Sequence, residues 1–501
     1  MNQQEKTEGL GACYVTMPVC RKMTTMELSG DYTLPDYQPE LRRLLTVSGR
    51  ALPPAKYVGG GAVELDGTME YQILYVGADG GLYSAPLTGE YSLHLPMDNL
   101  SAFDLNEGVC VFATCTPETI TARVTAPRKL SLRCRMKCAV GAYGRMPLGE
   151  RLIGEVDPAS ICRRSAGVQT AALMSGRSDV ITISDEIPVP YDDVRVVNAD
   201  AGVLVSEVSA SGEETHVRGE VVVKLLCSSE DGRMTTETRK IPFEGELDTE
   251  AMSADGLSAR VSGCVCELTV KVEEDKILCD AQIVLEAHMG GNADVIYTAD
   301  LYSTEKPCRT TEREYGVSVF LGAVTGNLSQ SERMSATEKG IPEGANVLDV
   351  YGSANVDGCE ARDGRYIVSG QSRYVFICER DGEYSATEVL LPLRYETEGR
   401  EGVPDWSDVR AEVIACRGRV SGDTLELDAE LAVSGYFMGT GTISAPESVE
   451  FSADRKKKSG DAVLCYLAPD DTLWNVAKKY MVAPEDVEGD PENDPYVLIR
   501  E

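Results

Sequence analysis

Short runs of Val, Ile, Leu, Thr and Tyr recur along the whole chain, separated by Gly, Asp, Asn and Pro. This texture is typical of β-strands joined by tight turns. Residues 71–76 are almost continuously apolar, and residues 224–229 alternate, with Lys224, Leu226 and Ser228 against the residues between them. These patterns fit strands that are buried on one or both faces. We therefore expect a mainly β protein made of sandwich- or barrel-like domains.

One strand-turn unit occurs three times, at residues 67–80, 219–232 and 370–382. Each copy ends in Asp-Gly, and the three aspartates are 152 and 150 residues apart. Asp-Gly after an apolar run predicts a β-hairpin, because a tight turn needs the positive φ that these residues tolerate. The spacing indicates an internal repeat of about 150 residues.

Two further sets of segments keep the same order and a similar period. The first set is Leu34-Pro35, Ile187-Pro188 and Ile341-Pro342, and the second is residues 121–124, 258–261 and 410–413. We predict three tandem β-rich domains, at residues 1–164, 165–306 and 307–453. The alternative is one irregular β protein.

The sequence pattern changes after residue 453. Residues 454–460 form a linker with the basic run 455–458, for which we expect a solvated tether, with contact to a phosphate or an acidic partner as the alternative. In the final module, residues 461–501, one apolar helical stripe is formed by Leu473, Val476, Ala477 and Tyr480. Asp470 or Asp471 is expected to cap this helix at its N-terminus.

The charge balance limits the partners of the chain. With 48 basic and 81 acidic residues the net charge is −33, which opposes non-specific binding to nucleic acid or anionic lipid. We expect no transmembrane segment and no secretory signal, and hence a cytoplasmic protein with reduced cysteines. Neutral or basic protein surfaces are the expected partners.

No catalytic motif is recognised in the chain. It lacks a P-loop, a dinucleotide-binding glycine fingerprint, a zinc-protease helix and a Gly-x-Ser-x-Gly turn. The three histidines, at 94, 216 and 288, are far apart, and the cysteine pairs lack the spacing of a zinc site. We therefore expect no catalytic residues, no cofactor and no metal, and interpret the protein as non-enzymatic.

Residues 471–474, Asp-Thr-Leu-Trp, with Val476, Ala477 and Tyr480 after them, resemble the LysM signature. The resemblance implies a small α+β module of order βααβ, with strands at 464–467 and 496–499 and a short second helix from Pro484. LysM modules bind N-acetylglucosamine polymers beside the first strand-helix loop, here residues 468–473. The implied partner or glycan surface consists of Tyr466, Asp470, Asp471, Thr472, Leu473 and Trp474.

Two features of this module bear on its partner. Trp474 lies off the apolar stripe of the helix, so it is either available to a ligand or packed against the second strand. The module also holds ten acidic against three basic residues. That balance suits a basic protein surface better than a neutral glycan.

Residues 34–51 resemble the opening of the SPOCS domain, a family of endospore-forming bacteria, and the later repeats match it more loosely. SPOCS-type repeats followed by one LysM module are typical of spore-coat assembly proteins. The resemblance implies an adaptor in the mother-cell cytoplasm, at the forespore surface, that binds the coat morphogenetic ATPase or other coat proteins, partly through the LysM-like module. Exposed strand edges would give a route to self-association. The alternative function is binding of peptidoglycan or cortex through the LysM groove.

Overall fold

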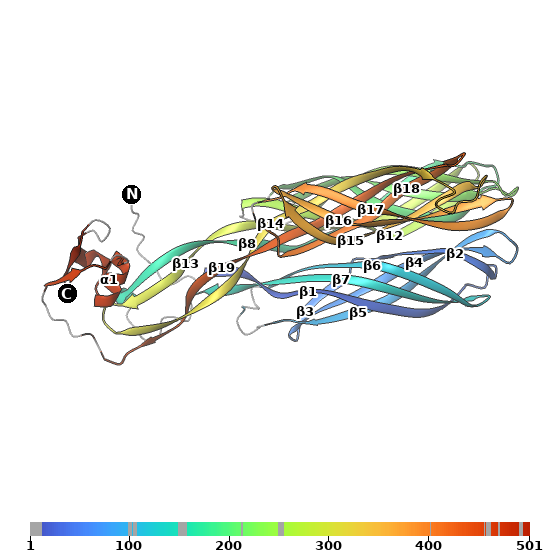
Figure 1. The fold of residues 1–501 in the computed structure, drawn as a ribbon. Coiled ribbons are helices and arrows are strands. Elements are labelled where there is room, and N and C mark those ends of the chain that lie inside the picture. The colour runs from blue at the N-terminus through green and yellow to red at the C-terminus, as the bar shows by residue number, and fades with distance from the viewer. Residues whose placement is uncertain are drawn as a thin grey trace.

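The protein is described by a computed structural model that covers residues 13–98, 103, 108–148, 158–211, 214–248, 255–400, 402–454, 456, 462–468, 471–489 and 494–500. Of these residues, 80% lie in β-strands, and the sheets are antiparallel, so the expected mainly β class is confirmed. Figure 1 shows an elongated molecule, with a body of packed sheets at one end and the short helix α1 at the other.

Repeat 1 contains the first seven strands, which are β1 (Cys13–Thr33), β2 (Leu41–Ala51), β3 (Ala55–Gly59), β4 (Ala62–Gly77), β5 (Leu82–Pro96), β6 (Val109–Ala126) and β7 (Lys129–Leu148). They form two sheets. One has the order β1-β7-β6, and in the other β4 is paired with β2, β3 and β5. The first and the last two strands of the repeat thus share one sheet, and the strands between them form the other.

Repeat 2 begins with the 3-10 turn η3 (Pro158–Ser160) and contains β8 (Ile161–Pro188), β9 (Arg195–Ser211), β10 (Glu214–Ser228), β11 (Met234–Asp248), β12 (Asp255–Val272) and β13 (Lys276–Ser303). Repeat 3 contains β14 (Cys308–Ser335), β15 (Asn346–Arg362), β16 (Arg365–Arg380), β17 (Glu383–Glu398), β18 (Trp406–Ser421) and β19 (Thr424–Phe451). Their sheet orders are β12-β13-β8 with β11-β10-β9, and β14-β19-β18 with β15-β16-β17. Apart from the additional strand β3, the arrangement of repeat 1 therefore occurs two more times.

The strand-turn units occupy the same place in each repeat. Asp79-Gly80, Asp231-Gly232 and Asp381-Gly382 lie in the turns after β4, β10 and β16, and each glycine has a positive φ. The predicted hairpins are confirmed. The second further set of segments does not lie at equivalent positions: residues 121–124 lie near the end of β6, whereas residues 258–261 lie near the start of β12.

The glycine that begins each strand-turn unit is required by close packing. A Cβ atom on Gly219 would lie 2.3 Å from the carbonyl oxygen of Leu204, and one on Gly370 would lie 2.0 Å from that of Asn355. In both places the strand pairing shifts register nearby, so a β-bulge brings the neighbouring backbone close. A Cβ on Gly67 would instead collide with the ring of Tyr91.

Each repeat buries an apolar core between its two sheets. In β10, Leu225 and Cys227 face this core, whereas Leu226 points the other way. Leu226 packs in one cluster with Leu74 and Ile377, and each of these residues stands seven positions after the glycine of its unit. Equivalent positions of the three repeats therefore meet at the centre of the body, and the middle strands are buried on both faces.

The second sheets of the repeats also contact one another in cyclic order. Strand β5 lies against β9, where Ser84 Oγ donates to the carbonyl of Val197 at 2.6 Å. Strand β11 lies against β15, where Thr236 donates to the carbonyl of Leu348 at 2.7 Å. Strand β17 returns to β2, where Arg43 donates to the carbonyl of Tyr384. Each of these six edge strands thus contacts a neighbouring repeat over part of its length.

Beyond the body, the ends of six long strands continue as a stem, which we define by its own apolar core. The core residues come from all three repeats: Val15, Met146, Leu148, Tyr297, Tyr315, Val317, Ile443 and Ala445. The predicted boundary at 164/165 lies inside β8, that at 306/307 lies between β13 and β14, and that at 453/454 follows β19. No helix among the described residues is both long enough and apolar enough to span a bilayer.

The C-terminal module stands at the end of the stem (Figure 1). It contains β20 (Ala462–Tyr466), α1 (Leu473–Tyr480), the 3-10 turn η4 (Pro484–Asp486), β21 (Val487–Glu488) and β22 (Tyr496–Arg500), with sheet order β20-β22-β21. Both predicted strands are present. The expected βααβ order is wrong in its second helix, because among the described residues one 3-10 turn stands where that helix was predicted. Its last residue, Asp486, leads directly into β21, which leaves no room for a full helical turn.

Candidate functional site

The N-terminus of α1 is capped by Thr472. Its hydroxyl accepts the N–H of Asn475 at 3.2 Å, so the predicted cap by an aspartate is wrong. The carboxylate of Asp471 instead accepts the N–H of Ala468 at 2.9 Å and closes the loop before the helix. Asp470 lies outside the described residues. The cap therefore falls one residue later than predicted.

The predicted apolar stripe of α1 is only partly buried. Val476 and Ala477 are buried in the core of the module, with Tyr480 packed beside them. Leu473, the first helical residue, remains 37% exposed. The stripe therefore orients the helix on its sheet, but its first member faces solvent.

The side chain of Trp474 is neither free in solvent nor packed within the module alone, because it also contacts repeat 2. Its indole N–H donates to the carboxylate of Asp300 at 2.7 Å. Its ring meets that of Tyr302 edge to face, with centroids 5.0 Å apart, and the guanidinium of Arg164 lies over the indole ring. All three partners belong to repeat 2, at the end of the stem. Trp474 is thus the residue by which the module docks on the stem.

Further contacts strengthen this docking. Lys478, one helical turn after Trp474, donates to the same carboxylate of Asp300 at 2.6 Å. The hydroxyl of Tyr302 donates to the carbonyl of Val482 at 2.6 Å. Lys456 donates to the carbonyl of Tyr480 near the helix C-terminus, where free carbonyls attract a cation. Lys456 is therefore part of the docked structure, whereas the rest of the basic run lies outside the described residues.

Asp300 is the electrostatic centre of this contact. Burial by itself raises the pKa of this carboxyl, but the hydrogen bonds from Lys478 and Trp474 outweigh burial, and the pKa lies below its usual value. The carboxylate is therefore ionised at neutral pH and accepts hydrogen bonds from both Trp474 and Lys478. Charge-assisted bonds of this kind are stronger than neutral ones.

The opposite face of the module is open. Tyr466 and Tyr496 are directly paired across β20 and β22, with ring centroids 6.2 Å apart, and are 76% and 49% exposed. Leu464, on the same face of β20, is 49% exposed. We call Leu464, Tyr466 and Tyr496 the outer face of the module. It is an apolar and aromatic surface turned away from the module core.

The structure divides the predicted partner surface. Tyr466 lies on the outer face, Asp471 and Thr472 hold the loop and the cap, and Trp474 faces the stem. Sequence reasoning missed Leu464 and Tyr496 as members of one surface, although their place on two predicted strands could have suggested it. No local signal marked Asp300 or Tyr302, because they are far from Trp474 in the chain.

The described residues offer no metal-binding cluster, since no group of three or more His, Cys, Asp or Glu side chains is placed to hold an ion. His94, His216 and His288 lie in β5, β10 and β13, as strand residues. His288 is buried against Phe112, with ring centroids 4.8 Å apart. These side chains therefore give no reason to assign a catalytic site.

Comparison of the chain with family models, with curated proteins and with solved structures found no match. The resemblances to SPOCS and LysM sequences consequently rest on the motifs of the chain itself.

Proposed function

We propose that this chain is a non-enzymatic assembly adaptor of the spore coat, which binds the coat morphogenetic ATPase through the outer face of its C-terminal module. The SPOCS-like and LysM-like motifs supply the biological setting. The mother-cell cytoplasm, at the forespore surface, is the proposed location. The cyclic packing of three repeats supports a rigid platform, from which the stem holds the module away from the body.

The observation that carries this proposal is the exposure of Tyr466 beside Tyr496. Two neighbouring tyrosines and a leucine on one sheet face, in water, are typical of protein interfaces, where aromatic anchors supply most of the binding energy. The docked side of the module is already occupied by repeat 2. A partner is therefore expected at the outer face.

The charge of the module indicates which partner surface fits. The module has ten acidic residues and three basic ones in its sequence. One of these basic residues, Lys478, is already paired with Asp300. A partner patch with an apolar centre and a basic rim would be complementary, and its association would be accelerated at low salt.

A second function, binding of N-acetylglucosamine polymers of the cortex or peptidoglycan, is favoured by one observation. The exposed rings of Tyr466 and Tyr496 could stack on sugars. The predicted groove residue Trp474 does not support this function, because its indole N–H and ring are engaged by Asp300 and Tyr302.

A binding titration distinguishes the two functions. Full-length protein, the double variant Y466A/Y496A and a 1–460 truncation are titrated with the coat morphogenetic ATPase and, separately, with N-acetylglucosamine oligomers. Tyr37→Ala is the matched control, since Tyr37 is also an exposed tyrosine and lies on repeat 1. Loss of two aromatic anchors is expected to cost about 2 kcal/mol or more of binding free energy.

The adaptor proposal predicts ATPase binding that is weakened in Y466A/Y496A and in the truncation and unchanged in Y37A. Glycan binding without ATPase binding would support the second function. ATPase binding that the double variant leaves intact would reject the outer face as the docking surface.

A further inference from the structure

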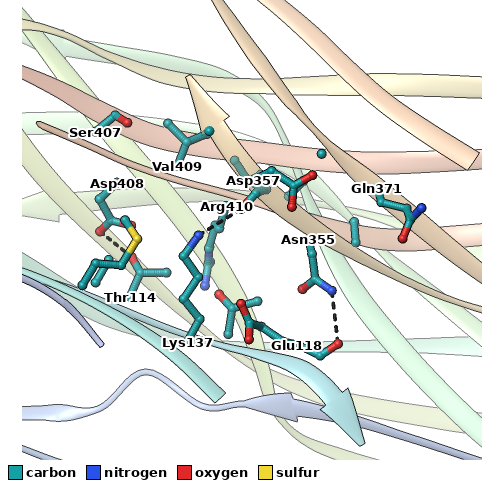
Figure 2. A pocket seen from close by; sticks show the side chains of 18 of the residues that line it. Thr114, Glu118, Lys137, Asn355, Asp357, Gln371, Ser407, Asp408, Val409 and Arg410 are labelled. Carbon is teal, nitrogen blue, oxygen red and sulfur yellow. Dashed lines mark hydrogen bonds between the residues drawn. The ribbon is translucent and has the colours of Figure 1, made fainter. Parts of the chain in front are cut away.

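A cavity of about 630 Å³ lies between repeat 1 and repeat 3, away from the C-terminal module. Strands β6 and β7 form one wall, and β15 and β18 form the other (Figure 2). Two hydrogen bonds cross it: Lys137 Nζ donates to the carbonyl of Val356 at 3.0 Å, and Asn355 donates to that of Glu118 at 3.2 Å. The cavity is therefore a built feature of the contact between two repeats.

Arg410 of β18 projects into this cavity with unused donors. Its Nε donates to the hydroxyl of Ser434 at 3.3 Å. Within the described structure, its two terminal amino groups have no acceptor within hydrogen-bonding distance, and no carboxylate pairs with it. Arg410 also lines two neighbouring cavities. A guanidinium presents five N–H groups in a planar fork that matches a carboxylate or a phosphate.

Lys137, on the facing wall, is the second cation of the cavity. It donates to Val356, and no carboxylate in the described part of the chain forms an ion pair with it. A lysine ammonium has three donors, so two remain for a ligand. Figure 2 shows Lys137 and Arg410 reaching into the same space from opposite walls.

The nearby carboxylates are mostly committed elsewhere. Glu118 pairs with Arg135 at 3.2 Å, and Asp408 accepts from Thr114 at 2.7 Å and from Arg260 at 3.3 Å. Asp357 is the remaining acid of the lining, and it is exposed at the bulge of β15. Two cations thus face the cavity with little local compensation, in a chain whose net charge is −33.

We infer that Arg410 and Lys137 form a binding site for the oxyanion of a small carboxylate- or phosphate-bearing molecule. The Arg410 fork would bind two oxygens and Lys137 a third contact, in a partly enclosed space where charge-assisted bonds are strong. Thr116, Asn355 and Gln371 line the same space and supply hydroxyl and amide groups for the rest of the ligand. The volume is that of ordinary small-molecule sites.

Occupation of this site also couples to stability. Its walls come from repeats 1 and 3, so a ligand that contacts both is bound only while these repeats are packed together. Such a ligand raises the melting temperature of the full chain in a concentration-dependent way. This site goes beyond the adaptor function and does not depend on it.

The test is calorimetric titration of the full-length protein with inorganic phosphate and with malonate, in a buffer of physiological ionic strength that contains neither. The variants are Arg410→Gln and Lys137→Met. The matched control is Arg417→Gln, an exposed arginine on the same strand β18 without an ion pair in the described structure. A melting curve of each variant without ligand verifies that it is folded.

We expect saturable binding of at least one of the two anions. Arg410→Gln should weaken it on the order of tenfold to a hundredfold, as is usual for loss of hydrogen bonds between charged groups. Lys137→Met should weaken it less, and Arg417→Gln should leave it unchanged. Preference for phosphate or for malonate identifies the ligand class. Absence of saturable binding for both anions, or undiminished binding by folded Arg410→Gln and Lys137→Met, would overturn the inference.

Discussion

The indole N–H of Trp474 donates a 2.7 Å hydrogen bond to the carboxylate of Asp300, which lies 174 residues earlier in the chain. Trp474 belongs to the sequence signature that resembles LysM, and Asp300 is near the end of the stem. The tryptophan of the signature therefore serves to fix the module on repeat 2. As a result, the opposite face, with Tyr466 and Tyr496, is presented outward.

Removal of Asp300 should loosen the docking of the module. Asp300→Ala leaves the indole N–H of Trp474 and the ammonium of Lys478 without their acceptor, and an unsatisfied buried donor costs about 1–3 kcal/mol. In a Trp406→Phe background, where Trp474 is the single tryptophan, its fluorescence emission should shift to longer wavelength. Asp294→Ala, an exposed change on the same strand, is the control. An unchanged emission in Asp300→Ala would contradict the docking role.

The same contact predicts a dependence on acid. The pKa of Asp300 in the folded state lies below that of an unfolded aspartate, which is about 3.9. A depressed pKa stabilises the docked state above the unfolded value, and this contribution is lost as the pH falls through the folded value. Trp474 emission is expected to be constant from neutral pH to about pH 4 and to shift only below it. A shift centred well above pH 4 would point to another group.

Asp408 should be a strong determinant of stability. It accepts from Arg260 and Thr114, and the three side chains, one from each repeat, are buried together. Asp408→Ala leaves the Arg260 charge buried without the carboxylate of its ion pair, which costs about 3–5 kcal/mol. The measurement is urea unfolding followed by circular dichroism. The control is Asp428→Ala, at an exposed strand residue, which should change the urea midpoint of unfolding little. Equal effects of the two changes would contradict the prediction.

His288 should make the protein sensitive to mild acid. Burial is the main cause that lowers the pKa of this imidazole to about 3. Glu286 opposes the shift, and Lys56, Arg260 and Arg410 add to it. An unfolded histidine titrates near pH 6.5. Stability is therefore complete above that value and falls between pH 6.5 and 3, because only the unfolded chain takes up the proton.

The measurement for His288 is the unfolding free energy at pH 7 and pH 5. Between pH 7 and pH 5 the unfolding free energy of the parent protein should fall by about 2 kcal/mol more than that of His288→Leu. This value corresponds to about 1.4 kcal/mol for each pH unit below 6.5. Both ring nitrogens of His288 lack a hydrogen-bond partner, so the replacement removes none. His94→Gln, at an exposed strand position, should retain the parent slope. Identical slopes in all three proteins would refute the assignment.

Gly370 should not tolerate a side chain. A Cβ atom there would meet the carbonyl oxygen of Asn355 at 2.0 Å, so Gly370→Ala must displace β15. Overpacking of this kind costs about 1–3 kcal/mol. Gly358, on the facing strand, has open space at its Cβ position and gives the control Gly358→Ala. The measurement is the melting temperature of both variants. A melting temperature of Gly370→Ala equal to that of the parent protein would contradict the prediction.

The sequence predicted the local structure well because β-strands and hairpins carry short-range signals. Alternation and apolar runs indicated strands, and Asp-Gly indicated turns at Asp79, Asp231 and Asp381. The recurrence of these signals also indicated the repeat. The set at residues 121–124, 258–261 and 410–413 failed, since similar short segments can occur at different positions along equivalent strands without any change in local pattern.

By itself, the sequence determined the strand content, the turn positions, the strands of the module and the helix at residues 473–480, since each depends on residues close in the chain. The tertiary structure decided which residues meet: Leu74 with Leu226 and Ile377, Thr114 with Arg260 and Asp408, and Trp474 with Asp300. Those contacts join residues of different repeats, or of a repeat and the module. The periodicity within a strand does not specify which distant residue will pack against it. For that reason the exposure of Tyr466, the docking of Trp474 and the open donors of Arg410 emerged only from the folded chain.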